Sequence, residues 1–561
     1  MIELIITATS QGLDLSPNQS VTIDYQNPMF KFDVSGGDYS LPFNIPITSR
    51  NKIILDHLEE LTIQSSLGKA IPCHIKSDGH RVMDGLLYID EVSFDLNNHN
   101  AGYYRASVVG VEGNFLQKIV DKNIRDFDYG VTSCGGSLLS YATSITNSGS
   151  NTIHAFPTII TDRNFASDTN EKNMEPYTLP LLYVLNFWND TASAFLLSDN
   201  SHLVPCLRVK YIFDTILTQL GYTYSGSFLG SNEFEKLFFA NNVLTFSSAG
   251  QLINNNYVPD ISCIDFFKSL LINFGLIPFA KSLTHIEFKT LSEIVASNKI
   301  KDWTPKVNPQ FTRKQNENGY TFSFKMDGED EAYTTQINPL LKPTHSYSEM
   351  EIVPWGATTP TLSRQLNAWI HHNSDFDNLY PYIFKKGEKQ LQSQIVPVCC
   401  DAPIYPVTPP SPIPDVGLFW SPVIDMQYTD AFALNYPVTG TFSSNSFQAK
   451  MMYYHGLQTL VTTYPYASNH NRLGFGILNS VMDVKNHLGW WGSEGLFDTY
   501  WKPFLEKKSN PDYLSSRAII HYDDLLNWDW TEQKRFVNQN FFIKKIRVEF
   551  PLRKSADLEL F

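Results

Sequence analysis

Carboxylates set among tryptophans are the residues of this sequence best suited to chemistry. They are Asp529 between Trp528 and Trp530, Glu532 nearby, and Glu494 and Asp498 beside Trp490 and Trp491. Sugar hydrolysis uses two carboxyl groups roughly 5–10 Å apart, with aromatic platforms for the sugar rings. Nothing in the spacing pairs these acids, and tryptophans at strand and turn boundaries are more often core or interface anchors. A carbohydrate-active or cell-wall-degrading enzyme is therefore the alternative, and we expect no enzyme.

Metal and cofactor chemistry is poorly supported. His371 and His372, with Asp375 and Asp377, are the nearest approach to a metal site. Adjacent histidines face opposite ways in a strand and splay apart in a helix, which favours a solvated loop. The acidic run that starts at Asp327 lacks the spaced oxygen ligands of a calcium loop. We find no C-x-x-C pair, phosphate loop, G-x-S-x-G or H-E-x-x-H, so we expect no metal and no cofactor.

The clearest elements lie between Leu207 and Thr304, where one design occurs twice. In the first copy an apolar stripe at helical spacing ends at Gly221, and a β-prone run starts at Tyr222. The stripe consists of Val209, Ile212, Phe213, Ile216, Leu217 and Leu220. Helix, glycine and strand in this order predict a packing device rather than a catalytic one.

The second copy begins with Ser262 and Asp265, which predict a capped helix start. Its stripe is formed by Ile264, Phe267, Leu270, Leu271 and Phe274, and Gly275 closes the helix. Strands are expected at Leu276–Ala280 and His285–Lys289, followed by Asp302, Trp303 and Thr304.

Length and composition predict a multidomain globular protein. The chain has 561 residues, of which 42% are hydrophobic and 18% charged, and a formal net charge of -14. This charge argues against specific nucleic-acid recognition, because DNA binders carry a basic face. No apolar run is long enough to span a membrane. The six scattered cysteines are expected to be free thiols in a reducing cytoplasm.

Short strands and turns are expected over much of the rest of the chain. Alternating residues before Asn114 predict a small β-barrel with one helix capped by Ser49, and Gly85 suggests a bulge. We expect a loop or a loosely packed insertion at Cys134–Ser150, a helix at Leu362–Ile370, and an extended linker or surface strap at Pro397–Pro414. Near the end, Leu496–Glu506 predicts an aromatic helix that contains Tyr500 and Trp501. The predicted fold class is α+β, mainly β, with small antiparallel β-barrels and interposed short helices.

Several stretches, in one order along the chain, resemble a phage tail hub protein of the baseplate-hub or tail-tip type found in phages of Bacteroidota and related hosts. They are Tyr39–Asn51, the helix end and following run at Leu220–Phe228, the helix end at Asn273–Leu276, Lys301–Thr304, Tyr453–Gln458 with Tyr464–Ser468, and Tyr500–Leu560. The segments Cys134–Asn200 and Pro397–Pro414 lie outside the resemblance.

The resemblance implies a structural virion protein with two related β-barrel domains and interposed helical and β domains. It implies a homotrimer whose paired barrels form a pseudo-sixfold ring that joins the tail tube to the tail tip or baseplate. A lumen would remain for DNA passage, and a negatively charged lining would prevent DNA from sticking. The expected location is the virion tail, after assembly in the cytoplasm of the bacterial host.

The residues carried over from this resemblance are structural, namely Gly221, Tyr222, Gly275, Asp302, Trp303, Thr304, Tyr500 and Trp501. Expected partners are the tail tube or distal tail protein, the tape-measure protein, and tail-tip or fibre proteins. A receptor-binding tail component is a further alternative. The expected domains are a hub barrel (1–114), a connecting region (115–205), helix–strand units (206–310), a second β-rich domain with a proline strap (311–415), and an α+β domain (416–561).

Overall fold

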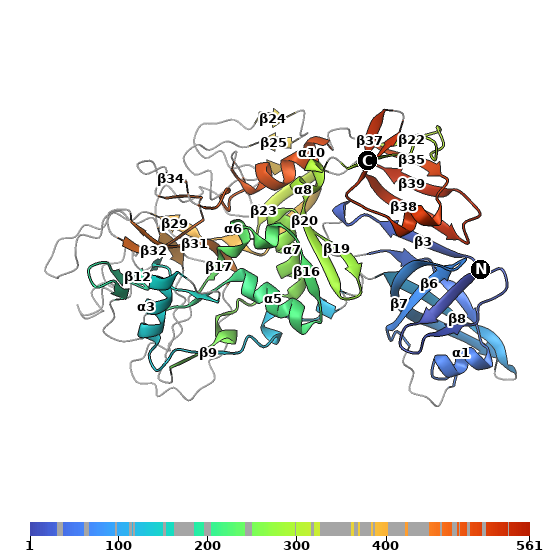
Figure 1. Cartoon of the computed structure of the whole chain (residues 1–561), viewed down its shortest axis with the longest axis horizontal. Helices are drawn as coiled ribbons and strands as arrows, with labels where there is room; N and C mark the ends of the chain where they lie inside the picture. The colour runs from blue at the N-terminus through green and yellow to red at the C-terminus, as the bar shows by residue number, and fades with distance from the viewer. Residues whose placement is uncertain are drawn as a thin grey trace.

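The structure is a computed structural model that is mainly β with short helices, as the sequence predicts. It describes the chain except for residues 31–36, 61–66, 96–97, 111–114, 116–117, 150–152, 162–183, 196–202, 242–249, 298, 316–318, 326–360, 364–367, 371–382, 385–387, 402–420, 425–447, 460–462, 470, 474–479, 482, 491–493, 508–511 and 537. Two large apolar cores organise the described residues, one in the middle of the chain and one shared by its two ends. The first lies at the left of Figure 1 and the second at the right.

One antiparallel sheet of twelve strands joins the two ends of the chain. Its strands are β1 (Ile2–Ile6), β2 (Gln11–Leu13), β3 (Val21–Gln26), β4 (Tyr39–Ser40), β5 (Phe43–Pro46), β6 (Ile71–Ser77), β7 (His80–Asp95), β8 (Asn98–Gly110), β22 (Thr312–Gln315), β35 (Asp512–Ala518), β38 (Ile543–Phe550) and β39 (Ala556–Leu560). Their order is β2-β1-β6-β7-β8-β4-β3-β38-β39-β35-β22, and β5 also pairs with β8. This order is open, so the strand pairing of the described residues gives no closed barrel.

We call residues 1–110 the N-terminal β unit, and residues 299–315 with 512–561 the C-terminal β unit. The N-terminal unit adds helix α1 (Ser49–Ile54), and the C-terminal unit adds helix α11 (Tyr522–Leu526). A second sheet in the C-terminal unit contains β21 (Ile300–Asp302), β36 (Gln533–Phe536) and β37 (Gln539–Phe541). Together the two units form the double β unit, in which chain ends far apart in sequence lie side by side (Figure 1).

The strands β3 and β38 form the seam between the two units. Across it, the carboxylate of Asp24 is fully buried and accepts hydrogen bonds from Arg547 Nε at 2.6 Å and Nη2 at 2.8 Å. Lys545 Nζ lies 2.8 Å away, and the Tyr39 hydroxyl donates to Asp24 at 2.9 Å. Burial alone would raise the pKa of Asp24, but these hydrogen bonds lower it to about 2. The buried acid therefore stays ionised and holds the two units together.

Backbone requirements explain one turn and one glycine within a strand of the N-terminal unit. Asp78 and Gly79 both have positive φ, at 50° and 84°, and connect β6 to β7 in a tight hairpin. The predicted bulge at Gly85 is wrong, since the register shifts instead between Ile75 and Lys76. A Cβ at Gly85 would lie 2.2 Å from the carbonyl oxygen of Val109, so the glycine permits close approach of β8.

We call the part of the chain outside the two β units the middle region. The doubled helix–glycine–strand design forms its centre. Its elements are α5 (Val209–Gln219), β16 (Thr223–Ser225), α7 (Cys263–Phe274), β19 (Leu276–Ser282), β20 (His285–Thr290) and α8 (Leu291–Ala296). The side chain of Ser262 accepts from the backbone N–H of Asp265, and Gly275 ends α7 with φ 58°, which confirms both predicted caps. Strand β16 pairs in parallel with β20, so the two copies of the design share one sheet.

Smaller sheets complete the middle region. The first sheet contains β17 (Leu237–Ala240), β28 (Val396–Pro397), β31 (Lys450–Thr459) and β32 (Thr463–Ser468). The second sheet contains β11 (Ile159–Thr161), β12 (Val184–Leu185), β29 (Cys399–Asp401) and β30 (Ser421–Ile424). The third sheet contains β23 (Gly319–Phe324), β24 (Thr361–Ser363), β25 (Ala368–Ile370), β26 (Ile383–Phe384) and β27 (Glu388–Ser393). Two-stranded pairs are β9 (Val131–Ser133) with β18 (Gln251–Ile253), β10 (His154–Ala155) with β15 (Cys206–Leu207), β13 (Trp188–Asn189) with β14 (Ala194–Phe195), and β33 (Arg472–Leu473) with β34 (Ser480–Val481).

Several local predictions are corrected. The expected loop at Cys134–Ser150 contains helix α3 (Leu138–Ser148), capped by Ser137 and ended by Gly149 at φ 63°. The expected helix at Leu362–Ile370 is instead a pair of strands, β24 and β25. The side chain that caps α1 belongs to Thr48, one residue before the predicted Ser49.

Two further α-helices are α6 (Asn232–Glu235) and α10 (Lys502–Lys507), the latter preceded by a π-helical turn at Phe497–Trp501. This turn and α10 confirm the helix predicted near Tyr500 and Trp501. Among the described residues, no helix combines the length and the apolar character needed to cross a membrane.

Candidate functional site

The segment Asp302-Trp303-Thr304 ties two distant parts of the C-terminal unit together. Strand β21 pairs in parallel with β36, and the backbone N–H of Trp303 donates to the carbonyl oxygen of Arg535 at 2.9 Å. The Thr304 backbone N–H donates to Asp302 Oδ1 at 2.9 Å, and the hydrogen bonds from Thr304 lower the pKa of Asp302. This turn directs Trp303 into the shared core, where the residue is 1% exposed.

Two further tryptophans and one lysine lie around Trp303. The rings of Trp303 and Trp528 meet edge to face at 5.4 Å, and Trp528 meets Trp530 in the same way at 5.1 Å. The Nζ of Lys534 lies 5.2 Å from the ring of Trp303 and 4.9 Å from that of Trp528, close enough for cation–π attraction. Burial lowers the pKa of Lys534, and its ion pair with Glu532 offsets only part of this effect.

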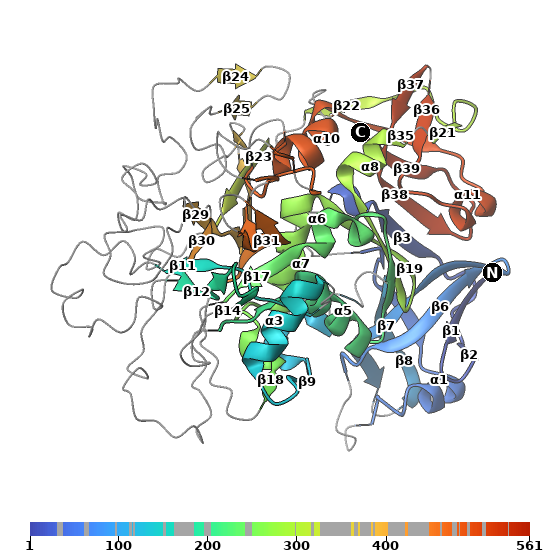
Figure 2. The same ribbon diagram turned by 60° about the vertical axis from the view of Figure 1, so that its left-hand side comes forward.

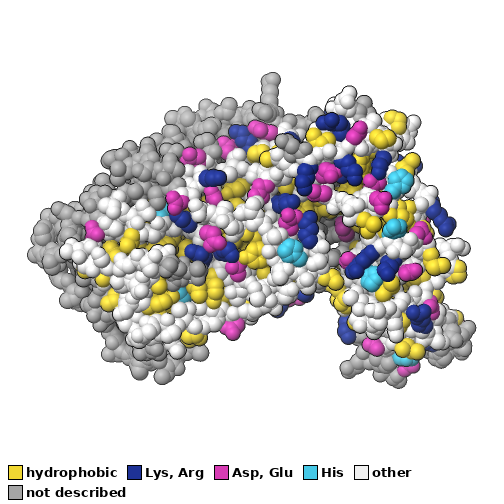
Figure 3. Space-filling model, in the orientation of Figure 1, with side chains coloured by type: hydrophobic (Ala, Val, Ile, Leu, Met, Phe, Trp, Pro, Cys, Tyr) yellow, Lys and Arg dark blue, Asp and Glu magenta, His cyan; other side chains and the backbone are white. Residues whose placement is uncertain are grey.

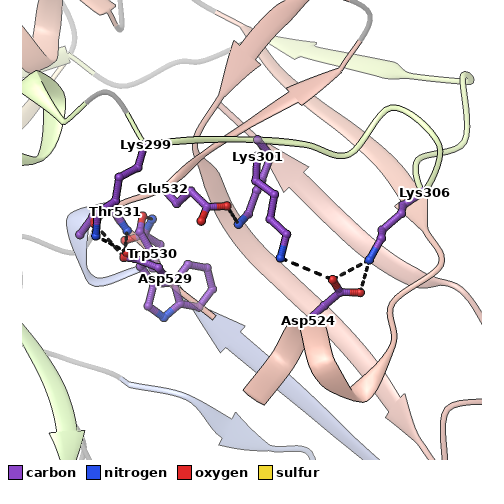
Figure 4. Close-up of polar contacts among 10 residues, drawn as sticks. Lys299, Lys301, Lys306, Asp524, Asp529, Trp530, Thr531 and Glu532 are labelled. Atoms are coloured by element: carbon purple, nitrogen blue, oxygen red, sulfur yellow. Dashed lines mark hydrogen bonds and ion pairs between the residues drawn. The ribbon is translucent and has the colours of Figure 1, made fainter. Parts of the chain in front are cut away.

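Two further carboxylates hold the surrounding loops through lysines from the segment 299–306 (Figure 4). Both oxygens of Asp524 accept from Lys306 Nζ at 2.6 Å, and Lys301 Nζ lies 3.9 Å away. Burial tends to raise the pKa of Asp524, but the hydrogen bond from Lys306 and the charge of Lys301 leave it lowered. The cluster thus connects β21 and the loop after it to α11.

Asp529 is the carboxylate that sequence analysis set between two tryptophans. It accepts from Thr531 Oγ1 at 2.6 Å and from the Thr531 backbone N–H at 2.9 Å, and Lys299 Nζ lies 3.0 Å away. Burial would raise the pKa of Asp529, but these contacts lower it to about 2. A general acid for sugar hydrolysis needs the opposite shift.

The other acids of the glycosidase interpretation also have fixed partners. Glu532 pairs with Lys534, Asp498 lies 3.5 Å from Lys502 one helical turn away, and Glu494 accepts from the Asn471 side chain at 2.9 Å. These contacts show carboxylates that join neighbouring segments. The arrangement can hold loops and strands in place.

The other motif residues lie in the middle region. A Cβ at Gly275 would lie 3.4 Å from Tyr500 Cβ, and Trp501 Nε1 donates to the carbonyl oxygen of Ile272 at 2.7 Å. Gly275, Tyr500 and Trp501 are therefore brought together, where the π-helical turn packs on the end of α7. The Tyr500 hydroxyl also donates to Asn486 Oδ1 at 3.1 Å.

Gly221 and Tyr222 follow α5 in the same region. Gly221 has φ 78°, and the ring of Tyr222 packs edge to face on Phe115 at 5.4 Å. Lys118 Nζ lies 4.6 Å from the centre of the Tyr222 ring. The eight motif residues thus divide between two regions, with Asp302, Trp303 and Thr304 in the C-terminal unit and the other five in the middle region.

The metal-ligand candidates from the sequence fall on residues that the structure does not describe. His371, His372, Asp375, Asp377 and the run from Asp327 lie outside the described residues. Sequence analysis did not identify one further cluster, in which ligand atoms of His57, Glu59 and Glu60 lie within 4.8 Å of one another.

Protein contacts already engage the central acid of that cluster. The Tyr104 hydroxyl donates to Glu59 at 2.6 Å, and Lys52 Nζ lies 3.7 Å away. In the sequence, this cluster is visible only as one histidine followed closely by two glutamates. This pattern is common on protein surfaces and does not by itself predict a metal site.

Sequence analysis also did not identify the lysines as partners of the acids. Lys306 and Asp524 are 218 residues apart, and Lys299 and Asp529 are 230 apart. Only the spacing of Lys299 and Lys301, two residues apart and close to Trp303, is visible in the sequence. The pairing itself depends on how β21 meets β36.

Comparisons with known proteins give distant likenesses. No protein-family model matches the chain, and no curated protein matches it. Among solved structures, a 43 kDa tail protein of prophage MuSo2 from Shewanella oneidensis is similar over 100% of this chain and 97% of its own, with 8% identity and a TM-score of 0.34.

Two further solved structures are similar at the same level. A tail protein from Neisseria meningitidis MC58 has 8% identity and a TM-score of 0.30, over 100% of this chain and 94% of its own. The prophage tail protein gp18 from Listeria monocytogenes EGD-e has 7% identity and a TM-score of 0.31, over 100% and 93%. These TM-scores are low, and nothing about this chain is concluded from them.

Proposed function

We propose that this protein is a structural component of a phage tail, a homotrimeric hub that joins the tail tube to the tail tip or baseplate. The ordered resemblance of Tyr39–Asn51, Lys301–Thr304 and the other stretches to hub proteins supports this function. The proposed role is mechanical, with a central lumen left open for DNA. The protein would be located in the virion tail after assembly in the host cytoplasm.

The observation that carries the proposal is the pairing of β3 with β38. This pairing sets a β unit from each end of the chain side by side, while the helical and β elements of the middle region lie between them in sequence. Three copies would then present six β units around one axis. Such a ring would match a sixfold tube on one side and a threefold tip on the other.

The contacts of the candidate site agree with a structural role. Its tryptophans are buried or paired with one another, and its acids hold lysines from distant segments. Expected partners are the tail tube or distal tail protein, the tape-measure protein, and tail-tip or fibre proteins. Each would contact the assembled ring rather than a single site.

Electron microscopy of phage particles labelled with an antibody against this chain tests the proposal. We expect label at the junction of tail tube and tip, and a reconstruction with three copies around the axis. Label on the capsid, or a lone copy in each particle, would contradict the hub.

A zymogram on the host envelope tests the enzymatic alternative. We expect no clearing by the purified chain. Clearing that disappears in Glu532→Gln or Asp498→Asn would replace the structural role with a catalytic one. Each substitution removes the carboxylate of an ion pair, Glu532 with Lys534 or Asp498 with Lys502. A thermal melt of each variant therefore serves as the folding control.

A further inference from the structure

Charge is divided unevenly between the two β units. The N-terminal unit has thirteen Asp and Glu against seven Lys and Arg, a formal charge of -6. The C-terminal unit has thirteen Lys and Arg against nine Asp and Glu, a formal charge of +4, within a chain of -14. Figure 3 shows several Lys and Arg side chains, with Asp and Glu among them, at the upper right over the C-terminal unit. An acidic chain therefore carries a basic unit beside an acidic one.

The acidic unit and the basic unit extend to opposite ends of the shared sheet. Strand β2 lies at one end, with α1 packed against it, and strand β22 lies at the other, paired to β35. Both ribbon views place α1 far from β22 and β35, and Figure 2 shows β1 and β2 beside α1 at the bottom of the double β unit, with β22 and β35 at its top. The sheet is thus an oriented body with two different ends.

We name these ends by their charge. The acidic end comprises residues 2–14 and 49–60, with five Asp and Glu against two Lys and Arg. Glu3 and Glu60 are exposed there. The basic end comprises residues 312–315 and 512–518, with three Lys and Arg against one Asp. Arg313 and Arg517 are exposed there.

Each end also has one isoleucine that a lone chain leaves in water. Ile53 on α1 is 68% exposed, and Ile519 directly after β35 is 61% exposed. An apolar side chain surrounded by charged ones is typical of a contact with an apolar centre and a polar rim. Opposite charges and an exposed isoleucine at each end make the two ends complementary to each other.

We propose that the basic end of one copy docks on the acidic end of the next copy, so that Arg313 and Arg517 face Glu3 and Glu60. This contact is head to tail, and a head-to-tail contact generates a ring when the rotation closes. The inference rests on the proposed hub and specifies how its copies meet. Acidic and basic β units would then alternate around the ring, and their attraction would steer assembly.

A second copy fits the basic end better than nucleic acid does. A nucleic-acid site presents a basic stripe to phosphates. Here Arg517 Nε lies 3.2 Å from the Asp557 carboxylate, and Lys544 Nζ lies 3.4 Å from that of Glu559. Carboxylates interspersed among the cations repel a continuous polyanion, whereas a protein surface with both signs can match them.

Sedimentation of the full-length chain tests the docking. We expect the wild type to associate, with at least a tenfold weaker association at about 500 mM than at about 50 mM salt, since salt screens charge attraction. The variant R313E/R517E and the variant E3K/E60K are each expected to lose association by at least tenfold. The four changes in one chain are expected to restore it, because both ends are then reversed. Ile519→Gln is expected to weaken association threefold or more.

A matched control is R553E/K554E, which makes the same charge change in the turn between β38 and β39, where both side chains are exposed. Its association is expected to stay within twofold of wild type. A thermal melt of every variant separates loss of docking from loss of folding, and the restored four-change variant excludes misfolding independently.

The remaining outcomes separate this inference from the proposed hub. A wild type that is monomeric at both salt concentrations contradicts the hub itself. A trimer unchanged in R313E/R517E and E3K/E60K keeps the hub and overturns this docking. Binding of duplex DNA that R313E/R517E abolishes without changing association would make the basic end a polyanion site and also overturn it.

Discussion

The double β unit and the middle region hold their residues together in different ways. In the middle region, α7 passes through Gly275 directly into β19, and β19 pairs with β20 a few residues later. In the double β unit, Asp24 meets Arg547 across 523 residues. The α7–β19–β20 centre of the middle region is built from neighbours in sequence, whereas the double β unit is completed only when both chain ends have folded. The double unit should therefore respond to single changes as a whole, and the middle region more locally.

The largest expected effect is at the seam. Replacing Asp24 by alanine leaves Arg547 and Lys545 without their buried carboxylate, and breaking a buried pair costs about 3–5 kcal/mol. We expect hydrogen exchange to lose protection on β3 and β38 together, while α5 and α7 keep theirs. Equal loss of protection in α5 and α7 would remove the distinction between the two regions.

The exposed pair of Arg81 and Asp84, in the same unit, provides the control for that change. Asp84→Ala is expected to alter the free energy of unfolding by less than about 1 kcal/mol, as exposed pairs do.

Two glycines sharpen the comparison further. In Gly85→Ala the new Cβ meets the carbonyl oxygen of Val109 at 2.2 Å, so β7 and β8 must separate. We expect a loss of about 3 kcal/mol in the free energy of unfolding, at the upper end for overpacking. Gly221→Ala meets no atom within 4 Å and strains only a φ of 78°, at a cost of about 1–2 kcal/mol. Equal losses in denaturant titrations would show that close strand approach is not the constraint.

Acid should weaken the seam within a defined pH range. The pKa of Asp24 falls from 3.8 to about 2 on folding, so the stabilisation is complete above pH 4 and is lost as pH falls toward 2. The linked free energy is about 2.5 kcal/mol. We expect protection of β3 and β38 to decline over this range in wild type and to show a shallower decline in Asp24→Asn. The same slope in both proteins would assign the pH dependence to other acids.

The smallest expected effect lies in the middle region. Trp501→Phe removes the indole N–H that donates to the Ile272 carbonyl oxygen at 2.7 Å and leaves that buried acceptor unpaired. We expect a loss of about 1–2 kcal/mol, confined to α7 and the π-helical turn in hydrogen exchange. A loss of protection that spreads to the strands of the double β unit would show that the two regions unfold together.

The same contrast explains what the sequence could predict. The helices α5 and α7 were predicted because stripe, cap and glycine lie within one short stretch. The helix α3 was missed because its serines and threonines outweighed the local caps at Ser137 and Gly149. The seam of β3 and β38 could not be read, since alternation shows that a strand has an apolar face but not which strand lies beside it.

At the candidate site, the sequence identified Trp303 and Asp529 but not their roles. The lysines that fix the carboxylates come from another part of the chain, so the spacing of the acids among tryptophans resembled a sugar site. The closed barrels implied by the resemblance also depend on long-range pairing, and the described strands give an open order. Local signals were thus sufficient for α5 and α7 with the caps of α7, and insufficient for the partners of strands and acids.

A cryo-EM reconstruction of the purified full-length oligomer tests the account most directly. It predicts three copies around an axis, with β22 and β35 of each copy facing β1, β2 and α1 of the next. A ring held together by the middle regions, with the double β units pointing away from one another, would contradict it.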